Sequence, residues 1–162
     1  MRLAAVAILA IAAGTAASAA DPKLDMLAFF TGKTHAENVI KVALHGSSKL
    51  VVDSVGGKGD RGDFVLVDTV HEEGKPVRTR KWVMRPAGPD HFTGSLSDAT
   101  GPVDVTIKGD TATIRYIMTD GHLSIVQQLQ LQPDGKTLAN HVTAKKFGLK
   151  FGRVDGEVRK LD

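Results

Sequence analysis

The stretch from Arg80 to Gly101 holds the residue types with the most chemical potential in this sequence. Arg80, Trp82 and Asp98 all occupy even-numbered positions, and Trp82 is the only tryptophan of the chain. On a β-strand, residues two apart point to the same face, so the three side chains can share one surface. An arginine, an indole ring and a carboxylate on one face can form an ion-paired brace, a ligand pocket or an acid–base pair.

The rest of the sequence offers few parts of a catalytic site. It has no cysteine and no Gly-x-Ser-x-Gly motif, which excludes a cysteine nucleophile and the nucleophile elbow of α/β hydrolases. Its six histidines lack His-x-His or His-x-x-x-His spacing, so we expect surface positions for them and no metal site. Glu72 and Glu73 fall in a predicted hairpin tip. We therefore expect no enzyme, no catalytic residue and no cofactor.

The first 20 residues are typical of a secretory signal peptide. Met1-Arg2 gives a positive start, residues 3–13 are an unbroken apolar run, and Ala17-Ser18-Ala19 is the small-x-small pattern that signal peptidase accepts. We expect cleavage after Ala19 or Ala20 and export to the bacterial periplasm as a soluble protein. Residues 21–162 are then a single barrel domain, in which no apolar run reaches the ~20 residues of a membrane span.

Charge argues against a nucleic-acid partner. The chain has 21 Lys and Arg against 18 Asp and Glu. The basic residues are scattered, without the stripe and stacking aromatics of a nucleic-acid surface. The sequence indicates no oligomeric state and no particular protein partner.

The elements that position these residues are short strands. From Gly32 onward, runs rich in Val, Ile and Thr are separated by turn signals such as Asp120-Gly121 and Asp134-Gly135. Closing such a meandering sheet removes its exposed edges. We predict an all-β, antiparallel up-and-down (lipocalin-like) barrel of about 8–10 strands. The strands are expected near 34–45, 48–55, 63–72, 77–85, 91–97, 102–108, 111–119, 122–131, 136–146 and 149–160.

A short helix is expected before the first strand, as a lid or plug. Asp21 can cap it, Pro22 suits the first helical position, and Leu24, Leu27 and Ala28 share one face.

Alternation within the strands predicts the interior. Ile114, Tyr116 and Met118 share the apolar face of one strand, and Asn140 lies on the apolar face of another. The strand over 77–85 has no clean apolar face. We place Trp82 inside, because a sole tryptophan on a strand is more often buried, and this brings Arg80 inward as well. The predicted ligand-binding set is Arg80, Trp82, Asp98, Tyr116 and Asn140.

A buried arginine needs a partner, and Asp98, on the neighbouring strand, is the expected one. Three uses of this set stay open. A closed brace of Arg80, Asp98 and Asn140 can fix the strand register and leave no cavity. Alternatively, Arg80 can bind the anionic head group of a small amphipathic or lipid-like ligand, while aliphatic side chains hold its tail. A lipocalin-like enzyme would need a titratable interior group with a strongly shifted pKa. An envelope accessory protein would instead act through its surface.

Motifs spread along the chain support the barrel. They are “FFTGKTHAENVI” at 29–40, “RKW” at 80–82, “HFTGSLSDATG” at 91–101, “IRYIM” at 114–118 and “NHVTAKKFGLKFGRV” at 140–154. In this order they resemble a bacterial exported family known as domain of unknown function 3833. The resemblance implies a lipocalin-like barrel and export to the envelope, and it implies no reaction. Two features depart from the family pattern: no lipid-anchoring cysteine is present, and Asn38 stands where a glycine is expected.

Overall fold

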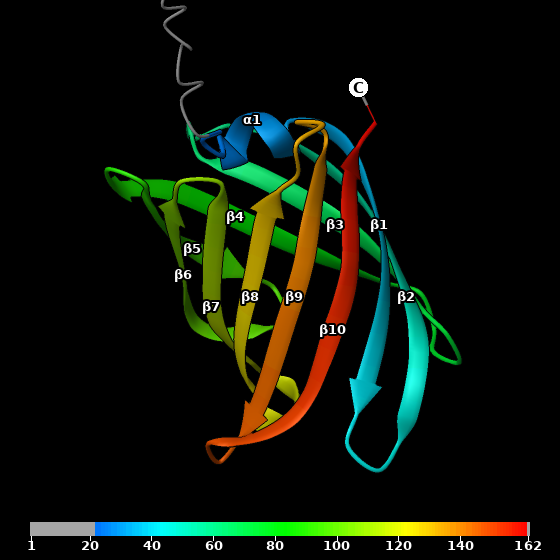
Figure 1. Cartoon of the computed structure of the whole chain (residues 1–162). Coiled ribbons are helices and arrows are strands. Elements are labelled where there is room, and N and C mark those ends of the chain that lie inside the picture. Colours follow the sequence, from blue (N-terminus) through cyan, green and yellow to red (C-terminus); the bar gives the residue numbers. More distant parts are fainter. Residues whose placement is uncertain (1–21, 162) are drawn as a thin grey trace, which may run out of the picture.

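Ten antiparallel strands follow one another around a closed barrel (Figure 1). The structure is a computed structural model that describes residues 22–161, so the predicted signal peptide lies outside the described residues. β1 pairs with both β2 and β10, which closes the ring. The strands are β1 (Gly32–Val42), β2 (Gly46–Lys58), β3 (Phe64–Glu72), β4 (Arg78–Gly88), β5 (His91–Leu96), β6 (Ala99–Lys108), β7 (Thr111–Met118), β8 (Ser124–Leu131), β9 (Thr137–Lys146) and β10 (Leu149–Lys160).

The predicted up-and-down barrel is therefore confirmed, with its strands at the expected places. Differences occur at strand ends. The first strand stops at Val42, because Leu44 adopts a left-handed φ of 67° in the following turn. β6 begins at Ala99, three residues before the predicted start. Residues Asp120–His122 form a single 3-10 turn, η1, ahead of β8. Over residues 22–161, no helix has the length and apolar character needed to cross a bilayer.

The predicted helix exists, but its start and its buried face were wrong. α1 covers Met26–Phe30, and the carboxylate of Asp25 caps it by accepting a hydrogen bond from the Ala28 backbone N–H (3.0 Å). The preceding residues are extended, because the Leu24 N–H donates to the carbonyl of Gly109 (2.9 Å). Asp21 lies outside the described residues. Rather than Leu27 and Ala28, the helix buries Met26, Phe29 and Phe30.

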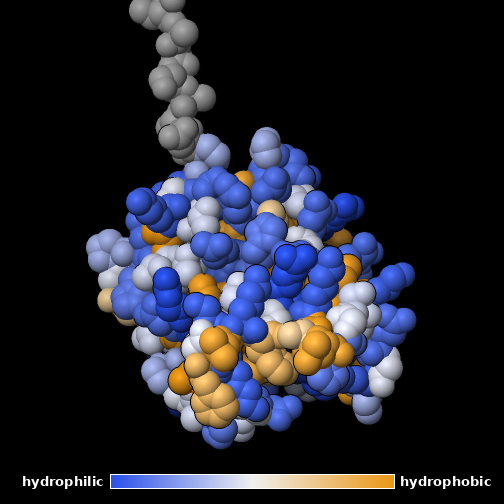
Figure 2. All heavy atoms as spheres, turned by 60° about the horizontal axis from the view of Figure 1, so that its bottom comes forward, coloured by the Kyte–Doolittle hydropathy of each residue, from blue (hydrophilic) through white to orange (hydrophobic). Residues whose placement is uncertain are grey.

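α1 closes one end of the barrel. Leu24 is bonded to the turn between β6 and β7. At the other end of the helix, Nζ of Lys160 on β10 donates to the carbonyls of Ala28, Phe29 and Thr31 (3.1, 3.0 and 2.6 Å). A lysine at this position also balances the partial negative charge of a helix C-terminus. These two anchors hold α1 across the barrel (Figure 1), while the opposite end, shown in Figure 2, carries the single 3-10 turn η1 and no α-helix over the described residues.

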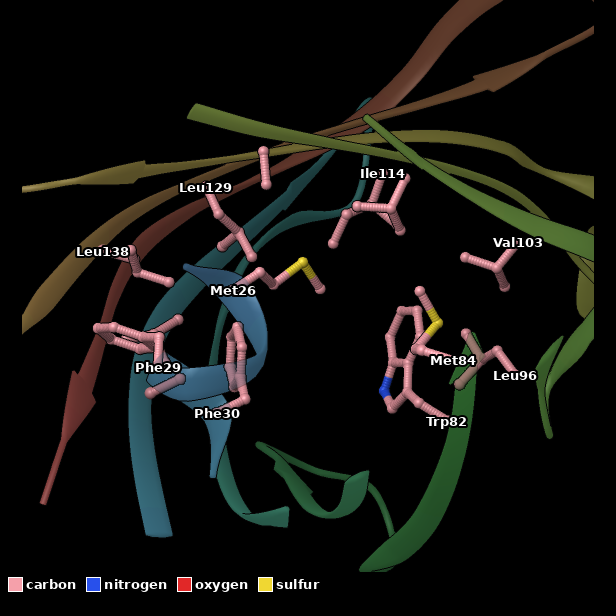
Figure 3. Packing of buried hydrophobic residues seen from close by; sticks show 14 of the residues in the cluster. Met26, Phe29, Phe30, Trp82, Met84, Leu96, Val103, Ile114, Leu129 and Leu138 are labelled. Carbon is pink, nitrogen blue, oxygen red and sulfur yellow. The ribbon is translucent and has the colours of Figure 1, made fainter. Parts of the chain in front are cut away.

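Alternation sorts the side chains as the sequence predicted. On β7, Ala112, Ile114 and Tyr116 are buried while Arg115 is exposed. Beneath α1 these inward residues form the packed core (Figure 3). Met26, Phe29 and Phe30 of α1 belong to one buried cluster with Leu129, Leu138, Trp82, Met84 and Leu96 of the strands.

Candidate ligand-binding site

Away from α1 the barrel is hollow. A cavity of about 1090 Å³ extends from Phe30 and Trp82 to the turns at the open end. Eight strands enclose an interior that side chains just fill or that holds one small ligand. Ten strands enclose more, and α1 fills only one end. The aliphatic part of the lining comes from inward positions of β1, β2, β3, β8, β9 and β10: Ala36, Ile40, Val42, Leu50, Val52, Leu66, Ile125, Leu129, Val142, Ala144, Val154 and Val158.

A buried carboxylate organises the polar part of the wall. Asp68 on β3 is only 3% exposed and accepts hydrogen bonds from three side chains. Ser54 donates through its hydroxyl (2.8 Å), Arg80 through Nη2 (3.0 Å) and Trp82 through its indole N–H (2.8 Å). We call these four residues the Asp68 cluster. It ties β2, β3 and β4 together on the inner face and holds Arg80 with its charge compensated.

Strand register explains why these residues meet. Ser54 faces Asp68 across β2 and β3, and Asp68 faces Arg80 across β3 and β4. Trp82, one inward position further along β4, reaches Asp68 diagonally. Asp68 was not identified from the sequence as a site residue, although its distance along the chain from the predicted hairpin turn indicated that it faces Arg80. Asp68 and Arg80 each lie six residues from Gly74, the centre of the predicted hairpin.

The predicted ion pair between Arg80 and Asp98 is wrong. Backbone bonding between β4 and β5 ends at Lys81 and Ser97, so Asp98 falls in the turn beyond β5. There its carboxylate accepts a hydrogen bond from Nη1 of Arg78 (2.9 Å), nearer the open end. Asp98 still lines the cavity, and one of its oxygens, Oδ1, is buried and without a hydrogen-bond partner among the described residues.

Two aromatic rings flank the arginine. The Arg80 guanidinium lies 5.5 Å from the centre of the Trp82 ring, and Trp82 meets Tyr116 edge-to-face at 5.6 Å. Burial is the largest single influence on the pKa of Arg80 and lowers it. The charge of Asp68, the smaller effects of Tyr116 and Asp98, and the hydrogen bond to Asp68 together raise the pKa above its ordinary value. Burial raises the pKa of Tyr116, although the charge of Arg80 opposes this. Arg80 is thus a permanent cation, and Tyr116 is a neutral phenol.

Arg80 keeps hydrogen-bonding capacity for a further group. A guanidinium carries five N–H donors, and Asp68 accepts from Nη2. The Nε of Arg80 is buried and has no acceptor within residues 22–161. An unpaired buried donor is costly, and Arg80 lines the cavity, so its guanidinium suits an acceptor atom supplied by a bound molecule.

A second polar group crosses the opposite wall. Asn140 on β9 donates to the side-chain oxygen of Asn38 on β1 (2.8 Å) and accepts from Gln127 on β8 (2.8 Å). β10 runs between the two asparagines, and its Gly156 faces both of them. A Cβ at Gly156 would lie 2.5 Å from Oδ1 of Asn38, so this glycine lets the two amides meet. The asparagine that departs from the family pattern is therefore a buried member of an amide group, in a continuous strand.

The structure brings all five predicted residues, Arg80, Trp82, Asp98, Tyr116 and Asn140, to the cavity wall. Sequence reasoning missed Ser54, Asp68, Asn38 and Gln127. Among the described residues that line the cavity, no histidine is available to activate the Ser54 hydroxyl. The described part of the chain also holds no group of three His, Asp or Glu side chains placed to bind a metal. The arrangement is suited to holding a molecule with one polar end and an apolar body.

Comparisons with known proteins agree with this fold. Residues 5–160 match the family model described as protein of unknown function (DUF3833). No curated protein matches the sequence.

Three solved structures are similar, each at low identity. The S-type phycobiliprotein lyase of Guillardia theta has a TM-score of 0.65 at 7% identity, over 84% of this chain and 90% of that one. Rv2717c from M. tuberculosis has a TM-score of 0.62 at 11% identity, over 84% of this chain and 95% of that one. A protein of unknown function of the DUF3598 family from Nostoc punctiforme has a TM-score of 0.56 at 10% identity, over 86% of this chain and 50% of that one. The chain thus spans half the length of the last protein. At these identities the likeness shows the fold alone.

Proposed function

Since the chain belongs to the DUF3833 family, whose members are of unknown function, we propose a function from its own geometry: the barrel binds one small amphipathic, lipid-like molecule in its interior. The observation that carries the proposal is the cavity of about 1090 Å³, with aliphatic walls and a buried arginine that has an unused donor. Pockets for small ligands are of about 300–1,000 Å³, mostly apolar, with few polar anchors. A packed, purely structural core would leave no such space.

The polar groups suggest how the ligand lies. Its head group accepts hydrogen bonds from Arg80, which suits a carboxylate, phosphate or ester oxygen. Tyr116 and Asp98 lie within the same part of the wall and supply a further donor and acceptor. The apolar body then lies against the aliphatic side of the barrel, where Ile40, Val142 and Val154 face the cavity.

We further propose that the ligand is bound without being converted. Ser54 has a hydroxyl that is engaged by Asp68, and no imidazole lies among the described lining residues to act as a base. The phycobiliprotein lyase is named for its activity, but at 7% identity that activity does not extend to this chain.

Export to the periplasm is part of the proposal. The charged start, the apolar run and the small-x-small site of the first 20 residues support it. N-terminal sequencing of the protein recovered from a periplasmic fraction should begin at Ala20 or Asp21. An intact Met1, or recovery only from the cytoplasm, would overturn it.

Energy transfer from Trp82 to a bound dye tests the cavity directly. The probe is 1-anilinonaphthalene-8-sulfonate, an anionic apolar dye, with dodecanoate as the competitor. We expect saturable transfer with one dye per chain and displacement by dodecanoate.

A space-filling variant and its matched control locate the binding. Val142→Phe adds an aromatic ring inside the cavity and should abolish dye binding. Thr143→Phe adds the same bulk on the outer face of β9 and should leave binding unchanged. Absence of transfer in the unaltered protein, or equal binding by the two variants, would refute the proposal.

A further inference from the structure

The open end of the barrel carries large apolar side chains in full contact with solvent. Leu44, in the turn between β1 and β2, is 102% exposed; Phe147 and Leu149, at the turn between β9 and β10, are 94% and 77% exposed. The two turns belong to neighbouring strand pairs, and the Ala43 N–H donates to the carbonyl of Phe151 (3.1 Å). We call residues 43–45 and 147–151 the lip. Viewed toward this end, apolar side chains gather among hydrophilic ones (Figure 2).

Turn geometry does not call for these residues. Leu44 and Phe147 have left-handed φ values of 67° and 51°. Glycine and asparagine adopt this region readily, whereas other side chains are disfavoured there by about 1–2 kcal/mol. Two bulky apolar residues therefore occupy strained and solvated positions. Neither the stability of the fold nor solubility favours Leu44 and Phe147 at these positions. We therefore expect their side chains to contact a surface outside the barrel.

Charge around the mouth is divided. Residues 38–52 and 135–154 contain no Asp or Glu. These two segments include the lip and the basic residues beside it, Lys41, Lys145, Lys146, Lys150 and Arg153. The other side of the mouth, formed by the turns after β3, β5 and β7, carries Glu72, Glu73, Asp98 and Asp120, of which Glu72 pairs with Lys75 and Asp98 with Arg78. The Lys146 ammonium lies 6.0 Å from the Phe147 ring, so charge and apolar surface are intermixed at the lip.

We propose that the lip docks the barrel onto an anionic lipid bilayer, with Leu44, Phe147 and Leu149 entering the interface and the lysines contacting the phosphates. Apolar side chains ringed by Lys and Arg are the combination that binds such surfaces. The lip is continuous with the cavity, because Phe151 belongs to the lip and also lines the cavity. Docking in this orientation faces the cavity mouth toward the membrane. This inference goes beyond ligand binding and does not depend on the cavity being filled.

Vesicle co-sedimentation tests the docking. The protein recovered from the periplasmic fraction is mixed with vesicles of equal parts phosphatidylglycerol and phosphatidylcholine, or of phosphatidylcholine alone. We expect binding to the anionic vesicles that weakens with added salt. The double variant Leu44→Asn/Phe147→Asn should lose at least about tenfold in affinity. Because asparagine tolerates left-handed φ, this variant should unfold at a temperature equal to or above that of the unaltered protein.

Matched variants separate the lip from general effects. Leu161→Asn removes an exposed apolar residue, 58% exposed, at the α1 end, and should bind as the unaltered protein does. Lys146→Gln and Lys150→Gln should each weaken binding by about fivefold, whereas Lys108→Gln and Lys136→Gln, at the α1 end, should not.

Three results would overturn the proposal. They are absence of binding to the anionic vesicles, equal binding by the lip variants and their controls, and a dimer on gel filtration that Leu44→Asn/Phe147→Asn converts to a monomer. The last would identify the lip as a contact between two copies of the chain. The cavity variant Val142→Phe should still bind vesicles, so a failure of ligand binding and a failure of docking are told apart.

Discussion

Removing the charge of Asp68 should destabilise the barrel far more than removing the charge of Asp98. The substitution Asp68→Asn keeps the size of the side chain and leaves Arg80 without its counter-charge. Asp68 is 3% exposed and accepts from Ser54, Arg80 and Trp82. The Asp68 cluster is therefore the part of the wall where a single lost charge has most effect.

The magnitude follows from burial. Breaking a buried ion pair by removing one partner costs about 3–5 kcal/mol, because the other charge stays buried and unpaired. The Arg80 side chain is 17% exposed and borders a cavity that can admit water, which favours the low end of that range. We expect Asp68→Asn to lower the free energy of unfolding by about 3 kcal/mol.

Asp98→Asn is the matched control. It removes the same charge from the pair with Arg78, whose side chains are 42% and 28% exposed. Exposed pairs contribute about 0–1 kcal/mol, so this variant should lose less than about 1 kcal/mol. Urea unfolding followed by far-UV circular dichroism measures both variants without relying on Trp82 fluorescence, which the first substitution alters directly.

A double variant tests the cause. If the unpaired Arg80 charge is responsible, adding Arg80→Gln to Asp68→Asn should restore about 1–2 kcal/mol, a non-additivity of the size seen for residues in one network. A free energy of unfolding for Asp68→Asn within about 1 kcal/mol of the unaltered protein, or equal destabilisation by Asp98→Asn, would refute the role assigned to the buried charge.

Two further predictions concern positions outside the Asp68 cluster. Gly156→Ala should lower the free energy of unfolding by about 1–3 kcal/mol, because the added Cβ would clash with the backbone carbonyl of Glu37 and lie 2.5 Å from Oδ1 of Asn38. Gly57→Ala, with no atom within 4 Å of the added Cβ, should be neutral. Equal urea midpoints for the two variants would contradict this. The Asp53 carboxylate accepts a hydrogen bond from Nδ1 of His35 and raises the pKa of His35 above its ordinary value of 6.5. The stabilisation by this pair is therefore present below about pH 6.5 and lost as pH rises through the folded-state pKa. NMR titration should show a raised pKa that Asp53→Asn returns toward 6.5, and an unchanged pKa in that variant would refute the assignment.

The barrel was predictable because turns and alternation are local signals. Asp134-Gly135 marks a strand reversal, and Ile114 and Tyr116 mark an inner face, without knowledge of distant residues. The start of α1 was not predictable in this way. It depends on the bond from Leu24 to Gly109, which joins residues far apart in sequence and holds the chain extended up to Asp25.

The site was predictable only in part. Burial of Trp82 followed from residue type, and the inward position of Arg80 followed from Trp82. The partner of Arg80 needed the exact ends of the strands: Asp98 falls past the end of β5, whereas Asp68 lies directly opposite. Centring the β3–β4 hairpin on Gly74 would have identified Asp68.

The cavity itself could not be read from the sequence. Inward aliphatic residues such as Val142 occur at the same positions in a packed barrel and in a hollow one. Which of the two forms depends on how many strands close the ring and on how far α1 reaches inside. Both are properties of the assembled fold.

Native mass spectrometry of the protein, purified under gentle conditions from cells that express the full chain, decides whether the barrel holds a ligand. We expect a population heavier than the polypeptide by the mass of one bound amphipathic molecule, which is released on unfolding. This population should be absent from Val142→Phe and retained by Thr143→Phe. A mass equal to that of the polypeptide alone, together with no uptake of added dodecanoate, would contradict it.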